Sequence, residues 1–270
     1  MILVNGVATD SVAATDRGLA YGDGVFRTLL AEQGSPLQWP RQYQKLARDC
    51  EVLAIPCPPE KLLSREVGLA IDRAREAVVK IIVTRGSGAR GYAPPHPVSP
   101  TRIILTAPRP DYPEEFGRAG VKVCWCRTRA SFQPRLAGVK HLNRLDNVLA
   151  RAEWNDPAVP EGLMVDEEGH IVGGTMTNLF ILEGGGLATP LLSSCGVAGV
   201  TRERVIEAAR KRGMDCREEP VTRARLLDAR AVLLVNSVIG VWQVSACAGH
   251  RWEPADFAAS VREWLDDDGD

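Results

Sequence analysis

A lysine in residues 138–146 is the strongest candidate for chemistry in this chain. Lys140 lies in a short loop, just before an amphipathic pattern that predicts a helix from about Leu142. The ε-amine of a lysine can form an imine with a carbonyl compound, and burial can lower its pKa until the amine is nucleophilic. Because most lysines are solvated surface charges, Lys140 gains weight only from the segments that accompany it.

A second candidate is an anion-binding loop at residues 196–201, which leads directly into a helical pattern. The N-terminus of a helix offers free backbone N–H groups and the positive end of the helix dipole, and both favour phosphate. Val200 and Thr201 would supply the donors, although Thr201 could instead simply cap the helix. Asn236 and Ser237 end an apolar strand and could bind the same anion, or they could mark an ordinary exit from the strand.

Helices and strands follow one another in the first hundred residues. Asn5-Gly6 predicts a tight hairpin, and helices are predicted from about Pro40 and from Pro58. Strands are predicted over residues 77–84 and 102–107. The glycines and prolines between them, in residues 86–100, predict an irregular loop.

The remainder of the chain predicts a second set of strands from about Gly120, a helix from Thr201 and a C-terminal helix. We therefore expect an α/β (α+β) protein with an N-terminal domain at residues 1–108 and a linker at 109–119. A larger C-terminal domain at 120–270 would carry Lys140. Ligand sites commonly form where two such domains meet.

Charge and cysteine usage exclude several classes of function. The chain has 33 Lys plus Arg and 34 Asp plus Glu, so no long-range attraction to nucleic acid or to an anionic membrane is expected. No apolar run has the length of a membrane span and no signal-peptide pattern precedes the first strand, which predicts a cytoplasmic protein. The seven cysteines form no CxxC pair, and the four histidines show no metal-ligand spacing. Reduced, mostly buried thiols and no metal site are expected.

Six segments occur in the order found in a known family: 16–26, 85–92, 137–146, 177–180, 198–202 and 236–237. Through them the chain resembles the fold-type IV pyridoxal-phosphate enzymes. Arg-Gly-Ser-Gly-Ala-Arg-Gly-Tyr and Lys-His-Leu-Asn-Arg-Leu make it most similar to the aminodeoxychorismate lyases. The resemblance implies a smaller N-terminal α/β domain, a larger C-terminal pseudo-barrel-like domain and a homodimer.

The resemblance also implies a reaction. Lys140 would bind pyridoxal 5'-phosphate covalently and then remove a proton from the amine-bearing ring carbon of 4-amino-4-deoxychorismate. Loss of the side chain as pyruvate leaves 4-aminobenzoate, a folate precursor. Tyr21, Arg90 and Tyr92 are the candidate substrate-binding residues of this small-molecule site. The alternatives are that Tyr21 is a packed aromatic and that Arg90 is a solvated loop charge.

The chain departs from the family pattern at four positions, the first being Gln42 in place of a histidine. Lys45 replaces an arginine that grips the cofactor phosphate, and it keeps the charge without the two-pronged geometry. Gly173 replaces a glutamate that bonds the pyridine nitrogen, so we expect Gly173→Glu to tighten cofactor binding. Arg27 stands where a glutamate or a small residue is frequent, and nothing in the sequence explains it. An aminotransferase for D-amino or branched-chain substrates and a catalytically impaired relative remain as alternatives.

Overall fold

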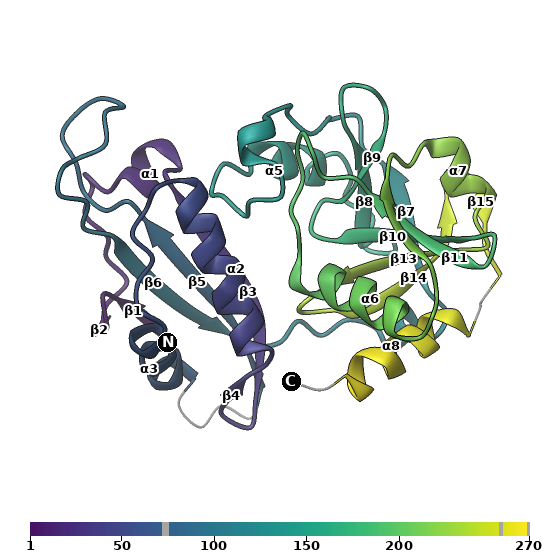
Figure 1. Ribbon diagram of the computed structural model, residues 1–270, viewed down its shortest axis with the longest axis horizontal. Coiled ribbons are helices and arrows are strands. Elements are labelled where there is room, and N and C mark those ends of the chain that lie inside the picture. Colours follow the sequence, from purple (N-terminus) through teal and green to yellow (C-terminus); the bar gives the residue numbers. More distant parts are fainter. Residues whose placement is uncertain (72–75, 254–255, 269–270) are drawn as a thin grey trace. The chain divides into compact units, whose positions relative to one another are not determined.

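The computed structural model describes residues 1–71, 76–253 and 256–268, and its chain forms two compact units (Figure 1). The first unit contains Met1–Pro110 and Val139–Asn143, and the second contains Asp111–Gly138 and the chain from Arg144 onward. The boundary at Pro110 is close to the end of the predicted N-terminal domain. Lys140 belongs to the first unit, however, and not to the C-terminal domain in which the sequence placed it.

The first unit is built from a sheet and three helices. Its elements are β1 (Ile2–Val4), β2 (Val7–Ala8), α1 (Arg17–Tyr21), β3 (Gly24–Glu32), β4 (Ser35–Pro36), α2 (Trp39–Val52), α3 (Glu60–Ile71), β5 (Glu76–Thr84) and β6 (Thr101–Ala107).

The sheet of the first unit is antiparallel, in the order β2-β1-β6-β5-β3-β4. Asn5 and Gly6 have φ values of 52° and 82°, so the tight hairpin predicted from this pair is confirmed. Helices α2 and α3 bury Leu46 and Leu63 against β3 and β5, which contribute residues such as Leu29. This packing fixes the face of α2 that carries the polar residues described below.

The second unit has a larger sheet. Its elements are α4 (Glu114–Arg118), β7 (Val121–Trp125), a short 3-10 helix (Pro134–Leu136), α5 (Leu145–Arg151), β8 (Glu161–Val165), β9 (Ile171–Gly174), β10 (Asn178–Glu183), β11 (Gly186–Pro190), α6 (Val200–Lys211), β12 (Cys216–Glu219), α7 (Arg223–Asp228), β13 (Ala231–Asn236), β14 (Gly240–Cys247), β15 (His250–Arg251) and α8 (Phe257–Asp267).

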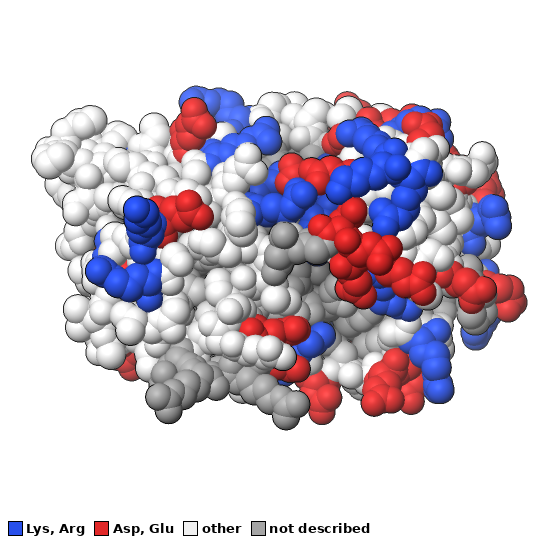
Figure 2. Space-filling view, turned by 60° about the horizontal axis from the view of Figure 1, so that its bottom comes forward, with Lys and Arg blue, Asp and Glu red and all other residues white. Residues whose placement is uncertain are grey.

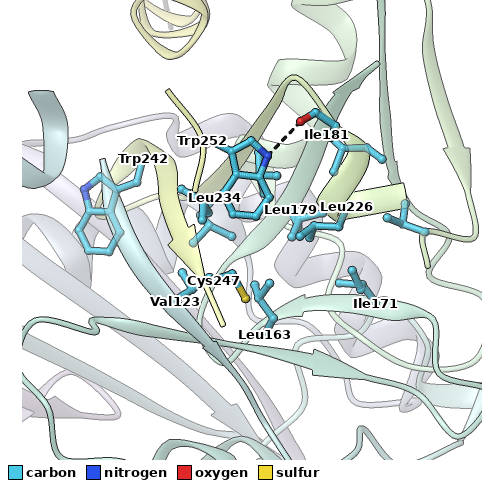
Figure 3. Close-up of a cluster of buried hydrophobic side chains, with 14 of the residues drawn as sticks. Val123, Leu163, Ile171, Leu179, Ile181, Leu226, Leu234, Trp242, Cys247 and Trp252 are labelled. Carbon is cyan, nitrogen blue, oxygen red and sulfur yellow. Dashed lines mark hydrogen bonds between the residues drawn. The ribbon is translucent and has the colours of Figure 1, made fainter. Parts of the chain in front are cut away.

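The sheet of the second unit runs β12-β11-β10-β13-β14-β7-β8-β9, and β15 pairs with β14. It mixes parallel pairs, such as β7 with β8, and antiparallel pairs, such as β10 with β13. On one side, apolar residues close around Trp252, whose indole N–H donates to the carbonyl of Ala229 at 2.9 Å (Figure 3). On the other, α6 and α8 pack Val205 and Val261 against β10 and β13. The α/β (α+β) class predicted from the sequence is confirmed.

The charged side chains and the cysteines are arranged as the composition leads us to expect. On the face seen in Figure 2, basic and acidic side chains are interspersed. All seven cysteines are free thiols, five of them buried, and burial raises the pKa of Cys126 to about 12. The prediction of reduced, mostly buried cysteines is confirmed. Among the described residues, no helix combines the length and apolar character of a membrane span.

Candidate functional site

Lys140 lies in an extended segment whose backbone is bonded to two elements of the first unit. Its N–H donates to the Oδ2 atom of Asp49 in α2 at 3.1 Å. Its carbonyl accepts from the N–H of Phe26 in β3 at 2.9 Å. The Nζ atom lies 4.5 Å from the centroid of the Phe26 ring, within the range of a cation–π contact. The backbone of Lys140 is therefore fixed on both sides.

The residues after Lys140 continue along the start of β3. Leu142 donates to the carbonyl of Gly24 at 2.9 Å, and His141 forms a β-bridge with Val25. A Cβ atom at Gly24 would lie 2.6 Å from a backbone oxygen and 2.8 Å from the Leu142 side chain, so only glycine permits this approach. The helix predicted from Leu142 begins at Leu145, because residues 140–142 pair with β3 instead.

Lys45, the predicted phosphate-binding lysine, is buried on α2, with 8% of its surface exposed. Its carbonyl accepts a hydrogen bond from Arg27 in β3 at 3.2 Å. Lys45, Arg27 and Asp49 therefore belong to one buried polar cluster that also includes the backbone of Lys140.

The predicted anion-binding loop lies at the start of α6 in the second unit. The N-cap is Gly199, which forms no side-chain cap hydrogen bond, so the alternative that Thr201 caps the helix is wrong. Thr201 is the second helical residue, and its hydroxyl lies 3.4 Å from the hydroxyl of Ser237. The first N–H groups of a helix have no partner within the helix. Two hydroxyls and the amides of Val200 and Thr201 form a donor set that suits phosphate.

Asn178 and Asn236 shape the loops around these hydroxyls. The Asn178 side chain donates to the carbonyl of Val197 at 2.7 Å and accepts from the N–H of Gly199 at 3.2 Å. Asn236 accepts from the amides of the two residues that follow Ser237 and donates to the carbonyl of Met176 at 3.1 Å. Asn236, predicted as a cofactor-binding residue, therefore uses its side chain to form the β13–β14 turn.

Gly173, where the family pattern has a glutamate, lies in β9 with a φ of 152°. A Cβ atom there would lie 2.6 Å from the carbonyl oxygen of Thr177. Any side chain requires the backbone to shift, so Gly173→Glu would carry a cost in stability that the sequence did not indicate, and the gain in cofactor binding stays a prediction.

Glu161, the buried carboxylate closest to Gly173 in the sequence, already has hydrogen-bond partners. Glu161 in β8 is fully buried and accepts from the N–H and hydroxyl of Thr175, the N–H of Met176 and the hydroxyl of Thr177. These hydrogen bonds fix the loop between β9 and β10. Glu167 and Glu168, which also lie close to Gly173 in the sequence, are exposed.

Tyr21, Arg90 and Tyr92, the predicted substrate-binding residues, occur around one irregular loop of the first unit, residues 86–100. The Tyr21 hydroxyl accepts from the N–H of Gly91 at 3.1 Å, and the ring packs on that of Tyr92 with centroids 5.4 Å apart. Tyr21 is thus partly the packed aromatic of the alternative interpretation. Arg90 and Tyr92 are exposed, Tyr92 to 84%.

Arg17, which sequence analysis missed, is bonded to this loop. Its guanidinium donates to the carbonyls of Gly91 at 2.9 Å, Tyr92 at 3.0 Å and Ala93 at 3.3 Å, and its Nε donates to Asp23 at 2.8 Å. With 4% of its surface exposed, Arg17 is an anchor and not a surface charge. The only sequence signal was its position in the 16–26 segment.

Asp23 joins two arginines under this loop. Its Oδ2 atom accepts from Arg17 and from Arg85, both at 2.8 Å. Burial acts to raise the pKa of Asp23, but the hydrogen bonds from Arg85 and Arg17 outweigh it and hold the pKa below its usual value. Asp23 is therefore ionised at neutral pH, and the charged cluster connects the 86–100 loop to α1 and to the residue before β3.

Comparison with known proteins gives the family. The model of the family described as "Amino-transferase class IV" matches residues 24–247. The crystal structure of 4-amino-4-deoxychorismate lyase from Pseudomonas aeruginosa is 42% identical, with a TM-score of 0.95, and the match covers 99% of each chain.

Two curated relatives carry different names. The aminodeoxychorismate lyase of Vibrio harveyi is 34% identical over 91% of this chain and 90% of its own. A putative branched-chain-amino-acid aminotransferase of Methanocaldococcus jannaschii is 29% identical over 98% of this chain and 95% of its own. The family match runs from the first residue of β3 to the last residue of β14, and the chain belongs to the class IV amino-transferase family.

Proposed function

We propose that this protein is a pyridoxal-phosphate-dependent aminodeoxychorismate lyase, which converts 4-amino-4-deoxychorismate to 4-aminobenzoate and pyruvate. The observation that carries the proposal is the likeness to the Pseudomonas lyase over nearly the whole chain, together with Lys140 in a fixed backbone segment. The reaction belongs to folate biosynthesis, and we propose a cytoplasmic location for the protein.

Each unit offers residues that fit the cofactor. In the first unit, Lys140 would bind pyridoxal phosphate covalently through its ε-amine. In the second unit, the amides of Val200 and Thr201 and the hydroxyls of Thr201 and Ser237 would donate to its phosphate. Lys45 adds positive charge, while Asn236 contributes by fixing the turn that carries Ser237. When bound, pyridoxal phosphate supplies the electron sink that stabilises a carbanion.

Lys140 also moves the proton that the reaction requires. Its ε-amine, when free, would accept the proton from the amine-bearing ring carbon of the substrate. A general base must lie within hydrogen-bond reach of that carbon's proton, and a fixed backbone limits the positions that the amine can take. The contact of Nζ with the Phe26 ring holds the side chain near the start of β3.

Gly173 favours the lyase over an aminotransferase. A carboxylate on the pyridine nitrogen is a charge-assisted bond of ~1.5–3 kcal/mol, or roughly ten- to a hundredfold in rate if all of it acts in the transition state. An aminotransferase must stabilise its carbanion without the formation of an aromatic product. The lyase forms an aromatic product, and this driving force lowers the demand on the electron sink. A chain with glycine at position 173 is therefore better suited to the lyase reaction.

Tyr21, Arg90 and Tyr92 bind the substrate in this proposal. Arg90 supplies a guanidinium for a substrate carboxylate, and bidentate Arg–carboxylate pairs are the strongest such anchors. The hydroxyl of Tyr21 and the ring of Tyr92 lie on the same loop cluster as Arg90. The Arg17 and Asp23 contacts position this cluster.

The experiment that separates the two activities is a product assay. The cofactor-loaded protein is incubated with 4-amino-4-deoxychorismate, and pyruvate and 4-aminobenzoate are measured. The same preparation is then tested for amino transfer from D-alanine and from branched-chain amino acids to an oxo acid. Pyruvate and 4-aminobenzoate in equal amounts support the lyase. Amino transfer without these products would overturn the proposal in favour of an aminotransferase, and neither reaction would indicate an impaired relative.

We also propose that the protein is a homodimer, as the resemblance implies. A chain of 29.3 kDa then sediments at about twice that mass. Sedimentation equilibrium at micromolar concentration measures this directly. A single species at the mass of one chain would contradict the dimer without affecting the proposed chemistry.

A further inference from the structure

Arg27, the residue that the family resemblance left unexplained, forms a buried ion pair. It lies on β3 with 2% of its surface exposed, and Asp49 lies on α2 with 3% exposed. The Nη2 atom of Arg27 is paired with the Oδ2 atom of Asp49. A buried pair of this kind is costly to desolvate, so stability alone is a weak reason for it. Its role has to be sought in what else the pair contacts.

The carboxylate of Asp49 is also bonded to Lys140. The same Oδ2 atom that pairs with Arg27 accepts the backbone N–H of Lys140 at 3.1 Å. On the other side, the carbonyl of Lys140 accepts from Phe26, the residue next to Arg27 in β3. The two members of the ion pair therefore flank the backbone of Lys140, one through a direct bond and one through its neighbour in the strand.

The hydrogen bond that Asp49 accepts from the Lys140 N–H is stronger when the Asp49 carboxylate is ionised. Burial raises the pKa of Asp49, and the Arg27 guanidinium opposes this effect by favouring the carboxylate. A hydrogen bond to an ionised acceptor is roughly twice as strong as a bond between neutral groups. Arg27 thus has a physical reason to be present: it favours the ionised form of the acceptor that holds Lys140.

We propose that Asp49 and Arg27 are positioning residues for Lys140: Asp49 fixes the backbone of the lysine, and Arg27 keeps Asp49 in the form that does so. The inference rests on the proposed function of Lys140 as the cofactor lysine. Neither residue acts on the substrate. Their effect is to restrict where the ε-amine can lie, which matters because small displacements of a reacting group cost large factors in rate.

The test compares two double variants that differ in whether the side chain at position 49 can accept the N–H of Lys140. Arg27→Met/Asp49→Asn removes both charges and keeps an oxygen that can accept the Lys140 N–H. Arg27→Met/Asp49→Leu removes the same charges and puts a side chain of similar size but no acceptor at position 49. If the leucine variant does not fold, Arg27→Met/Asp49→Ala replaces it, because alanine has no acceptor and the best helix propensity.

A second buried ion pair of the same unit provides the control. Arg102 in β6 and Glu66 in α3 are bonded at 2.9 Å, and Glu66 is 2% exposed. Within the described part of the chain, Arg102 and Glu66 bond to each other and Arg102 to Asn5, and neither bonds to residues 139–143. Arg102→Met/Glu66→Leu therefore measures what the loss of a buried pair does to the unit as a whole.

Two quantities are measured for each variant beside its thermal midpoint. The first is amide hydrogen exchange of residues 138–144 in the cofactor-free protein. The second is the rate at which added pyridoxal phosphate becomes fixed to Lys140 by borohydride. In the leucine variant, we expect the amides of residues 138–144 to exchange faster, and the cofactor to be taken up more slowly, than in the asparagine variant. Each rate should differ by roughly two- to tenfold, which corresponds to the net free energy of one hydrogen bond. The control pair should lower the thermal midpoint and leave both rates unchanged.

The outcomes separate this inference from the proposed function. The positioning role would be overturned if the asparagine and leucine variants had equal exchange and uptake rates, or if the control pair changed these rates as much as the leucine variant does. The proposed function would stand in either case, provided that borohydride still labels Lys140 in the wild type. A label on a different lysine in the wild type would overturn the proposed function and the positioning role together.

Discussion

At the scale of the residue, the backbone contacts of Lys140 matter more than its side chain alone. Its N–H and carbonyl are bonded to Asp49 and Phe26, and its Nζ contacts an aromatic ring. A surface lysine loses side-chain entropy whenever it is ordered, whereas the backbone of Lys140 is ordered before any ligand binds.

Gly173 gives a prediction at the same scale. Gly173→Ala should destabilise the protein by ~1–3 kcal/mol, because its φ of 152° is strained for other residues and a Cβ meets the Thr177 carbonyl. Gly68→Ala is the matched control, since Gly68 lies in helix α3 with open space around it, and alanine should stabilise by ~0.5–1 kcal/mol there. Urea unfolding measures both. Equal effects of the two substitutions would contradict this interpretation of Gly173.

Sequence reasoning found the residues with distinctive chemistry and missed those that hold them. Lys140 and Thr201 were found because their segments match a family pattern. Arg27 was noticed but left unexplained, and Asp49 was missed, because no periodicity connects a strand residue with a helix residue 22 positions later. The interpretation of Thr201 as an N-cap was wrong because Gly199 already ends the preceding loop.

At the scale of the element, the 86–100 loop depends on anchors outside it. Arg17 in α1 donates to three consecutive carbonyls of the loop, and Asp23 joins Arg17 to Arg85. Glycines and prolines predicted the irregular course of this segment. They did not indicate what holds it in place, because the anchoring bonds come from residues about 70 positions away.

Arg17→Met tests this anchoring. The variant should be cleaved by trypsin after Arg90 faster than the wild type, by roughly tenfold or more, because three charge-assisted hydrogen bonds to the loop are lost. Time courses of native proteolysis followed by mass spectrometry measure the rate. Arg118→Met, at an exposed position of α4, is the control and should leave cleavage at Arg90 unchanged. A rate at Arg90 that Arg17→Met does not alter would show that the loop is held by other contacts.

The charge of Asp23 makes the same cluster sensitive to acid. Its pKa is lower in the folded protein than the value of about 3.9 in an unfolded chain, so its contribution to stability is present above that value. The contribution is lost as the pH falls through the lowered pKa. Wild type should therefore be more stable than Asp23→Asn at pH 7, and the difference should shrink at strongly acidic pH. A difference that is constant between pH 7 and acidic pH would contradict the ionised role of Asp23.

At the scale of the whole molecule, the sequence predicted the class and most of the longer elements. The helices from about Pro40, Pro58 and Thr201 are confirmed as α2, α3 and α6. Short elements such as β9 and β12 were missed, since four residues carry too little periodicity to identify. The segment carrying Lys140 was assigned to the second half of the chain, whereas it pairs with β3 in the first unit. Long-range pairing of this kind leaves no local signal.

The identity of the lysine that binds the cofactor tests the central claim most directly. The protein is incubated with pyridoxal phosphate, reduced with borohydride and digested, and the modified lysine is located by mass spectrometry. The account predicts one modified residue, Lys140, and no modification in a Lys140→Ala variant that retains the wild-type thermal midpoint. Modification of another lysine in the wild type, or undiminished modification of Lys140→Ala, would contradict it.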